Sequence, residues 1–311
     1  MDFYFECYSE LSLQRFMVSD KPRTDAFAEA IKEVVKGGER VLDIGTGTGL
    51  LAMLAAKAGA SSVYALDHSD IAKVAKVVVE NNHLEDKVEV IQGHASEFQL
   101  SEPVDLIVSE WLGHFAFVES MLDDVIDCRD QNLSPEGSML PSGVEVLLAP
   151  IDSPLLYDDE GPGQWIPPVH GIDFSCLEEL EVKQAIAIKT TVAPYDLLAP
   201  GQPIISVDLK TATKDHPYQA GEVSFTMQRD GRLDGFAGWF VAQLSPSVKL
   251  DTGPDAPTTH WQQSFLAIEP FDVAEGQVIT VRYYLSKHPA DRRSVELKLS
   301  VEEQSYNYTI G

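Results

Sequence analysis

Residues 41–50 read VLDIGTGTGL, an apolar strand candidate that runs directly into three glycines at alternate positions. Short apolar runs alternate with helical spacings on both sides of this stretch. Helix candidates occupy residues 26–36, 49–60 and 70–82, and strand candidates occupy residues 40–43, 62–66, 87–91 and 104–108. This β-α-β-α alternation predicts a Rossmann-like, doubly wound and mainly parallel sheet.

The glycine-rich turn is the first candidate site. Gly45, Gly47 and Gly49 let the backbone approach a ligand where side chains would collide. Dinucleotide-binding turns usually have the spacing G-x-G-x-x-G, and here the third glycine comes one residue early. The acidic Asp43 before the turn favours S-adenosylmethionine, whose amino-acid moiety carries an ammonium group. Nucleotides, dinucleotides and an ordinary tight turn stay open as alternatives from this motif alone.

Polar residues follow the next two strand candidates. Asp67 ends the second strand, where a carboxylate can accept hydrogen bonds from both hydroxyls of a ribose. The alternative for Asp67 is a helix N-cap, although Ser69 or Asp70 suits that position better. Ser96 and Glu97 follow the third strand, where a loop that contacts adenine is expected. A Ser-Glu pair is equally common in ordinary loops.

The character of the sequence changes near Pro141, after a cluster of turn formers, SPEGSMLPSG, at residues 134–143. Short strand candidates punctuated by Gly, Pro and Asp then follow, which is typical of a β-sandwich or β-barrel. They occupy residues 144–148, 184–191, 204–209, 222–228, 235–244, 264–268, 278–285 and 295–301. The sequence therefore predicts an α/β domain followed by a β-barrel-like domain, with Pro141 at the hinge.

Composition limits the class of protein and its partners. The 311 residues, of which 44% are hydrophobic, can bury two separate cores. The formal charge of −26 argues against a nucleic-acid partner, because phosphate binding requires a concentrated basic surface. A cationic partner fits this charge, and an acidic surface kept for solubility or a high-salt habitat fits it equally well.

The three cysteines, Cys7, Cys128 and Cys176, are too scattered for a disulfide framework or a zinc site, and no metal is expected. The sequence contains no secretory signal and no apolar run long enough to span a membrane. We therefore expect a soluble, cytoplasmic protein without membrane contact.

A second candidate site lies in SEWLGHFAFVES (109–120), where Glu110 and Glu119 bracket apolar and aromatic residues. Glu110 follows the fourth strand, at the sheet edge where doubly wound folds bind ligands. Two carboxylates held close together in an apolar setting repel each other and tend to share a proton. A guanidinium relieves that conflict because it is planar, permanently charged and offers five N–H donors that two carboxylates can divide. The alternative is that Glu110 is a helix N-terminal charge and Glu119 an exposed helix residue.

Five segments together resemble the protein arginine methyltransferase family. SEWLGHFAFVESML (109–122) is similar to the double-glutamate loop of these enzymes, and VLDIGTGTGLLAMLAAKAGASSVYALD (41–67) is similar to their cofactor motif. YFECYSELSLQRFMVSDKPRT (4–24) resembles their N-terminal cofactor-covering helices. THW (259–261) resembles a tripeptide of the barrel domain that reaches the active site, and VHGIDFSCL (169–177) resembles part of a dimerisation arm.

The resemblance covers essentially the whole chain and implies a class I, S-adenosylmethionine-dependent protein arginine N-methyltransferase with type I-like activity. It implies cofactor-covering helices at residues 1–25, a Rossmann-like cofactor domain at 26–141 and a β-barrel substrate domain at 142–311. The dimerisation arm is expected at about residues 160–182. The expected substrate is an arginine-containing protein or peptide, and the expected assembly is a homodimer.

Carried over residue by residue, the resemblance implies three sets of functional residues. The catalytic set is Glu110, Glu119, His260 and Asp20. The cofactor-binding set is Phe5, Tyr8, Met17, Arg23, Asp43, Gly45, Gly47, Gly49, Asp67, His68, Ser96, Glu97 and Glu110. The substrate-binding set is Tyr8, Glu110, Trp111, Glu119, His260 and Trp261.

Four positions depart from the family pattern. Asp67 replaces the usual glutamate, and a side chain one methylene shorter should still reach a ribose. Ser96 replaces a frequent acidic residue, which makes Glu97 the alternative adenine contact. His114 replaces a frequent tyrosine and Val118 replaces an aromatic residue, which predicts a roomier or differently shaped peptide pocket.

Met17 and His260 bear on the product and the proton. The unbranched thioether of Met17, as in members that make asymmetric dimethylarginine, predicts ω-monomethyl- and asymmetric dimethylarginine. Glu119 or His260 is expected to accept the released proton, with Asp20 orienting His260. Two alternatives stay open: a methyltransferase for a small guanidino compound or peptide natural product, and a catalytically silent, cofactor-binding partner subunit.

Overall fold

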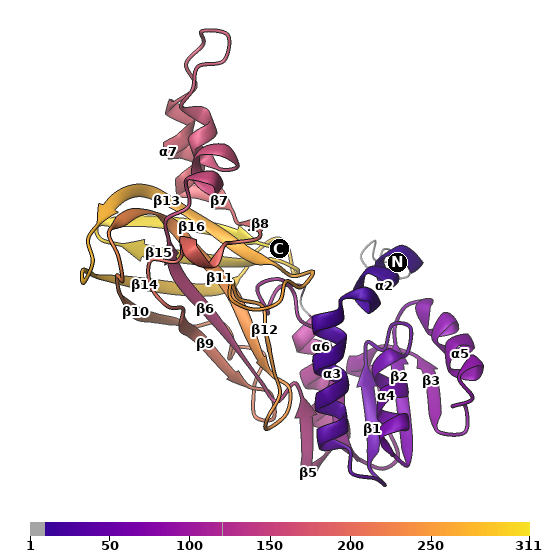
Figure 1. The fold of residues 1–311 in the computed structure, drawn as a ribbon. Helices are drawn as coiled ribbons and strands as arrows, with labels where there is room; N and C mark the ends of the chain where they lie inside the picture. Colours follow the sequence, from indigo (N-terminus) through magenta and orange to yellow (C-terminus); the bar gives the residue numbers. More distant parts are fainter. Residues whose placement is uncertain (1–9, 120) are drawn as a thin grey trace.

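The computed structural model describes residues 10–119 and 121–311. The predicted site residues Phe5 and Tyr8 lie outside these ranges. Figure 1 shows an α/β part formed by the earlier residues and a β-rich part that carries a projecting arm. Within the described ranges, no helix has both the length and the apolar character needed to cross a membrane.

Two helices precede the first sheet, α2 (Leu11–Ser19) and α3 (Lys21–Val34). The sequence predicts a helix from residue 26, whereas α3 begins at Lys21 and crosses the predicted N-terminal boundary. Asp20 explains the earlier start, because its Oδ1 accepts a hydrogen bond of 3.3 Å from the backbone N–H of Arg23. Pro22 follows in the first turn, where its missing N–H leaves no bond unmade.

The first domain is a five-stranded parallel sheet in the order β3-β2-β1-β4-β5. Its strands are β1 (Arg40–Ile44), β2 (Ser62–Asp67), β3 (Val88–Gln92), β4 (Val104–Ser109) and β5 (Leu133–Leu140). The helices that follow α3 along the chain are α4 (Leu50–Ala58), α5 (Ile71–Asn81) and α6 (Met121–Asn132). This arrangement confirms the predicted doubly wound fold, and its switch point lies between β1 and β4.

The strand β5 corrects one prediction, because the sequence indicates turns over residues 134–143. Pairing with β4 overrides the turn-forming composition: Met139 and Leu140 are buried and lie opposite Ile107 and Val108. The predicted division between the two domains, after Pro141, falls between β5 and the next strand.

The second domain contains two mainly antiparallel sheets, as the run of short strand candidates predicts. One sheet has the order β10-β14-β15-β16-β7 and the other β8-β13-β11-β6-β9, with β12 paired to β11. The strands β12 and β16 are absent from the sequence-based prediction. The bounds are β6 (Gly143–Ile151), β7 (Gln184–Ile186), β8 (Ile188–Thr190), β9 (Gln202–Asp208), β10 (Ala220–Thr226), β11 (Gly231–Gln243), β12 (Lys249–Asp251), β13 (Gln263–Val273), β14 (Val278–Lys287), β15 (Val295–Val301) and β16 (Gln304–Ile310).

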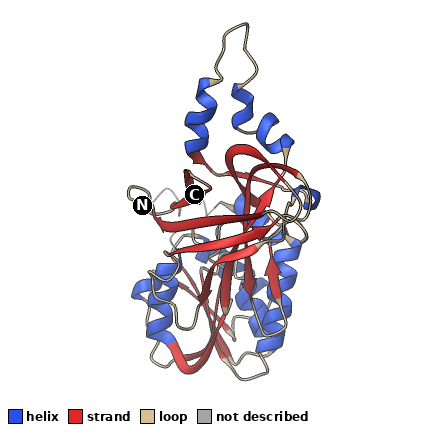
Figure 2. Ribbon diagram, turned by 90° about the vertical axis from the view of Figure 1, so that its left-hand side faces the viewer, coloured by secondary structure: helices blue, strands red, loops and turns tan. Residues whose placement is uncertain are grey.

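The predicted arm projects away from the β-rich domain (Figure 2). It contains a π-helical turn (Leu155–Asp159), a 3₁₀ turn (Pro162–Trp165) and α7 (Cys176–Lys183). Its apolar side chains are unusually exposed for residues of their type: Ile166, Val169, Ile172 and Leu180 are 51%, 54%, 59% and 66% exposed. Exposed apolar groups gathered on one projecting element are typical of a protein–protein contact.

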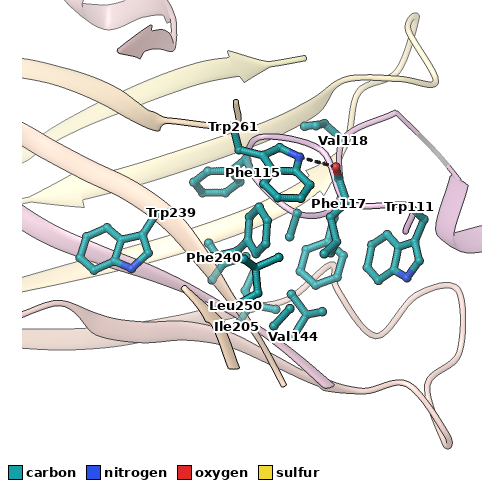
Figure 3. Packing of buried hydrophobic residues seen from close by; sticks show 14 of the residues in the cluster. Trp111, Phe115, Phe117, Val118, Val144, Ile205, Trp239, Phe240, Leu250 and Trp261 are labelled. Atoms are coloured by element: carbon teal, nitrogen blue, oxygen red, sulfur yellow. Dashed lines mark hydrogen bonds between the residues drawn. The ribbon is translucent and has the colours of Figure 1, made fainter. Parts of the chain in front are cut away.

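The loop after β4 joins the two domains. Phe115 and Phe117 are buried and lie against side chains of the β-rich domain (Figure 3). A Cβ atom on Gly238 of β11 would come within 2.6 Å of the Phe115 ring, so the glycine makes room for that ring. The indole N–H of Trp261 donates a 2.7 Å hydrogen bond to the Leu112 carbonyl. The second domain therefore fixes the loop that carries Glu110 and Glu119.

Candidate active site

A cavity of about 320 Å³ lies at the carboxyl ends of β1, β2 and β4, next to the switch point of the parallel sheet. It is lined from three directions: by α2 and α3, by the ends of the parallel strands, and by the β-rich domain. The predicted residues that line it are Met17, Arg23, Gly45, Gly47, Asp67, His68, Glu110, Trp111, Glu119, His260 and Trp261.

The glycine turn forms one wall of the cavity. Gly45 and Gly47 have φ angles of +72° and +55°, which glycine adopts without strain. A Cβ atom on Gly47 would lie 2.7 Å from Oε1 of Gln14, a buried residue of α2 that the sequence analysis missed. Gln14 lies three residues before Met17, so helical spacing could have placed both on the cavity side of α2. Gly49 is not part of the lining; it is the N-cap residue of α4 and has a left-handed conformation.

Asp43 lies beneath the turn and does not line the cavity, contrary to its predicted contact with the cofactor. It is 1% exposed, and its Oδ2 accepts hydrogen bonds from Thr46 Oγ1 (2.6 Å) and Ala52 N (2.9 Å). Its Oδ1 has no hydrogen-bond partner among the described residues. Burial raises the pKa of the Asp43 carboxyl to about 7. Asp43 therefore braces the glycine turn and the start of α4.

Asp67 lies at the end of β2 and faces the cavity. Its Oδ2 accepts from Gly47 N (2.9 Å), and its Oδ1 accepts from Ser69 N (2.9 Å) and Ser69 Oγ (2.8 Å). These bonds fix the carboxylate between the glycine turn and the loop before α5. Remaining lone pairs on its oxygens can accept from the hydroxyls of a bound ribose.

The cavity end beyond Asp67 differs from the prediction. Ser96 and Glu97 do not line it; the Ser96 hydroxyl lies 2.8 Å from His94 Nδ1. His94 lines the cavity and its ring meets that of His68 edge to face, with centroids 5.0 Å apart. Asp124 of α6 lines the cavity as well, and burial raises the pKa of its carboxyl. Neither His94 nor Asp124 has a distinctive spacing in the sequence.

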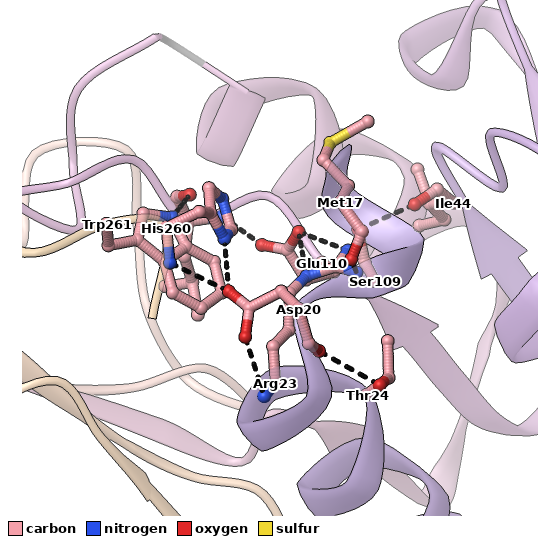
Figure 4. A network of polar contacts seen from close by, with 10 residues as sticks. Met17, Asp20, Arg23, Thr24, Ile44, Ser109, Glu110, His260 and Trp261 are labelled. Atoms are coloured by element: carbon pink, nitrogen blue, oxygen red, sulfur yellow. Dashed lines mark hydrogen bonds and ion pairs between the residues drawn. The ribbon is translucent and has the colours of Figure 1, made fainter. Parts of the chain in front are cut away.

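Glu110 is paired with Arg23 (Figure 4). Arg23 Nε and Nη2 donate to Glu110 Oε2 at 3.0 and 2.6 Å, and Arg23 Nη1 donates to the Met17 carbonyl at 3.1 Å. The Glu110 Oε1 atom accepts from Leu112 N at 3.0 Å. The two charged side chains are only 10% and 8% exposed. Arg23, predicted to bind the cofactor, therefore anchors Glu110 in this structure. Glu110 and Glu119 are called the glutamate clamp below.

Glu119 ends the loop in a left-handed conformation, with φ at +77° and its backbone N–H donating to the Arg293 carbonyl at 2.6 Å. Both Glu110 and Glu119 line the cavity, as predicted. His114, between them in sequence, lines it too, and burial followed by the charge of Lys189 lowers its pKa to about 4. His114 is therefore neutral at pH 7. Lys189 of β8 completes this side of the cavity and was not predicted.

The predicted contact between Asp20 and His260 is present. Asp20 Oδ2 lies 2.6 Å from His260 Nδ1 and accepts from the His260 backbone N–H at 2.8 Å. The rings of His260 and Trp261 lie 4.1 Å apart. His260 lines the cavity, whereas Asp20 stands behind it. The Asp20 carboxylate can thus hold the imidazole in one orientation.

Comparison with known proteins identifies the family. Residues 155–306 match the arginine methyltransferase oligomerization subdomain, and residues 19–146 match ribosomal protein L11 methyltransferase. Protein arginine N-methyltransferase 6 of Xenopus tropicalis is 33% identical, over 99% of this chain and 91% of its own length. This chain belongs to the protein arginine N-methyltransferase family. Protein arginine N-methyltransferase 1 of Schizosaccharomyces pombe is 35% identical over 96% of this chain and 88% of its own.

Solved structures of the protein arginine N-methyltransferases share the whole fold. A chain of the Trypanosoma brucei PRMT1 enzyme–prozyme heterotetrameric complex with AdoHcy superimposes with a TM-score of 0.91 at 30% identity, covering 98% of this chain and 99% of that one. Arabidopsis thaliana protein arginine methyltransferase 10 gives a TM-score of 0.87 at 31% identity, covering 99% and 100%. The two-domain architecture and the arm of this chain are thus those of its family.

Proposed function

We propose that this protein transfers a methyl group from S-adenosylmethionine to the guanidinium of arginine in proteins or peptides. One observation carries the proposal: Glu110 and Glu119 line the same cavity as the glycine turn of β1. The two carboxylates suit a planar, cationic methyl acceptor, and the glycine-rich turn after β1 suits a methyl donor that contains a nucleoside.

The residues of the cavity fit the cofactor. Gly45 and Gly47 carry no Cβ atom, so their backbone can lie close to a ligand, and Asp67 offers ribose acceptors. Met17 and Gln14 of α2 would cover it from the other side. When bound, S-adenosylmethionine supplies an activated methyl group on a sulfonium.

The acceptor is oriented by the two glutamates. An ionised carboxylate has about four lone-pair positions, and Glu110 uses three of them, for Leu112 N and for two nitrogens of Arg23. The remaining position on Oε1 can receive one N–H of the substrate, and Glu119 is the second acceptor. Carboxylates on one edge of a guanidinium concentrate its positive charge there and leave the opposite nitrogen more nucleophilic.

The released proton has an acceptor in the cavity wall. His260 is backed by Asp20, whose carboxylate stabilises the imidazolium that forms when the ring takes a proton. Glu119 is the alternative acceptor, as the sequence analysis also allows. We assign Trp261 a positioning role, because its indole N–H holds the Leu112 carbonyl of the glutamate loop.

Product, assembly and location go beyond the family assignment. The unbranched Met17 supports ω-monomethyl- and asymmetric dimethylarginine as products. The oligomerization subdomain and the exposed apolar side chains of the arm support a homodimer. A silent partner subunit is the second candidate, favoured by the enzyme–prozyme complex among the solved relatives. A cytoplasmic location remains a prediction from the sequence.

The test is methyl transfer from labelled S-adenosylmethionine to a peptide with a single arginine. The same peptide with lysine at that position, free arginine and a reaction without acceptor are the controls. We expect label in the arginine peptide, asymmetric dimethylarginine by mass spectrometry, and a loss of roughly 100-fold or more in kcat/KM for Glu119→Gln. Cofactor binding without transfer to any acceptor would identify a silent subunit, and transfer to free arginine alone would identify a small-molecule enzyme.

A further inference from the structure

Lys189 brings a positive charge to the acceptor side of the cavity. It lies in β8, a three-residue edge strand that pairs antiparallel with β13, where Lys189 is opposite Ser264. Because β13 begins two residues after Trp261, this pairing sets β8 beside the segment that carries His260. Lys189 is a lining residue of the cavity together with Glu119 and His114.

Hydrogen bonds of Gln262 and Gln263 fix the chain that directly follows β8. Gln263 is 3% exposed; its Oε1 accepts from Val192 N at 2.8 Å, and its Nε2 donates to the Thr252 carbonyl at 2.6 Å. Gln262 Nε2 adds a 2.9 Å bond to Thr191 Oγ1. These bonds hold the backbone just after Lys189. The Lys189 ammonium can therefore move by rotation of its side chain, but the strand that carries it stays in place.

The charge of Lys189 acts directly on the site. Burial lowers the pKa of its ammonium, and the carboxylate of Glu119 opposes that change, so the two charges are close enough to interact. The same ammonium helps to lower the pKa of His114. Among the described residues that line the cavity, Arg23 and Lys189 are the only arginine and lysine. Arg23 is paired with Glu110, so each glutamate of the clamp has a resident cation nearby.

A substrate guanidinium changes this balance. When the guanidinium pairs with Glu119, it neutralises the carboxylate that otherwise offsets the charge of the Lys189 ammonium. The Lys189 ammonium then faces the bound peptide as an uncompensated cation in a partly desolvated wall. Like charges repel and opposite charges attract across such a wall more strongly than in bulk water.

We propose that Lys189 is a specificity-determining residue, which disfavours a second cation beside the target arginine and favours an acidic or neutral neighbour. This inference rests on the proposed arginine methylation. It is independent of the overall charge of −26, whose field attracts basic peptides from a distance. The global field acts mainly on the encounter, whereas Lys189 acts on the bound peptide.

The size of the effect follows from Coulomb's law. We take the Lys189 ammonium and a charged peptide residue to lie roughly 8 Å apart, with an effective dielectric constant of about 60, between the values for a protein surface and for water. One such charge then changes kcat/KM about threefold. Changing that neighbour from glutamate to lysine reverses the sign, so the ratio between the two peptides changes roughly tenfold.

The test uses three peptides that differ only beside their single arginine, with Glu, Gln or Lys at that position. The enzymes are the wild type, Lys189→Met, the charge-conserving Lys189→Arg, and Lys298→Met as a matched control for an exposed lysine on β15 outside the cavity. We expect the Glu-to-Lys peptide ratio of kcat/KM to fall about tenfold in Lys189→Met relative to the wild type. The ratio should stay within about twofold of the wild type in the other two variants.

An unchanged ratio in Lys189→Met, with all peptides still methylated, would overturn the role of Lys189 and leave the proposed function intact. No methylation of any peptide by the wild type would overturn both. If Lys189→Met does not fold, Lys189→Gln replaces it with the same expected fall. A loss of activity that is equal for all three peptides indicates a merely structural lysine and also contradicts the proposal.

Discussion

Replacing Asp43 by asparagine is expected to change how the stability of the protein depends on pH. Asp43 is buried, with a pKa raised from 3.8 to about 7, so the folded protein binds this proton more tightly than the unfolded chain. Stability that the protonated carboxyl provides is therefore complete below about pH 4 and is lost as the pH rises to about 7. Asparagine cannot ionise, so the variant does not lose this stability as the pH rises.

The magnitude follows from the two pKa values. A rise of about 3 units corresponds to roughly 4 kcal/mol of unfolding free energy lost above pH 8, of which about 2.5 kcal/mol falls between pH 5 and pH 8. The amide oxygen of the introduced asparagine can still accept from Thr46 Oγ1 and Ala52 N, which bond to Oδ2 of Asp43 in the wild type. Its NH₂ group takes the place of Oδ1, which has no partner among the described residues. Any free energy lost by burying this NH₂ group without a partner is the same at every pH, because the amide does not titrate.

The assay is thermal and urea unfolding at pH 5 and pH 8, followed by tryptophan fluorescence. The stability of Asp43→Asn minus that of the wild type should rise by about 2.5 kcal/mol between the two pH values, or by roughly 4 °C in Tm. Asp86→Asn, at an exposed aspartate of the same domain, is the control and should follow the wild type. Parallel pH profiles for Asp43→Asn and the wild type would refute the reasoning.

Two further substitutions address the catalytic contact and the cofactor turn. Asp20→Asn is expected to lower kcat by roughly 10- to 100-fold, because a protonated His260 loses its carboxylate partner; an unchanged kcat and pH–rate profile would contradict a role of the Asp20 carboxylate in proton transfer. Gly47→Ala is expected to weaken S-adenosylhomocysteine binding by about tenfold or more in titration calorimetry, because Ala at φ +55° costs about 1–2 kcal/mol and its Cβ meets Gln14. Gly276→Ala, at a left-handed glycine with nothing within 4 Å, is the matched control and should lose stability without losing binding.

The parallel sheet was predictable because its signals are local. Apolar runs followed by amphipathic ones fix β1 to β4, and the glycine turn marks where the ligand lies on the sheet. The strand β5 was not predictable from composition, because its pairing with β4 decides it and the turn-forming residues of this segment give no sign of that pairing. The same limit applies to β12 and β16, which exist as strands through their neighbours in the sheet.

Within the site, sequence reasoning located most residues but not always their contacts. Asp43 has the acidic character expected of a cofactor contact, yet a buried aspartate before a turn can equally hold that turn, and only the fold decides which. Ser96 turns toward His94 instead of the cavity for the same reason. Lys189 has no motif at all, because an edge strand brings it to the cavity from a distant part of the chain.

The two clamp glutamates, Glu110 and Glu119, show how contacts that the sequence did not predict bear on function. From spacing alone, paired carboxylates in an apolar loop are expected to repel each other and share a proton until a substrate arrives. The structure supplies a cation to each instead: Arg23 from α3 bonds to Glu110, and Lys189 from β8 interacts with Glu119. A substrate guanidinium therefore exchanges with or joins cations already present, and does not have to neutralise a bare pair. Selectivity in such a site depends on the resident cations as well as on the acids, so that substitutions far from the double-glutamate motif can redirect which arginines are methylated.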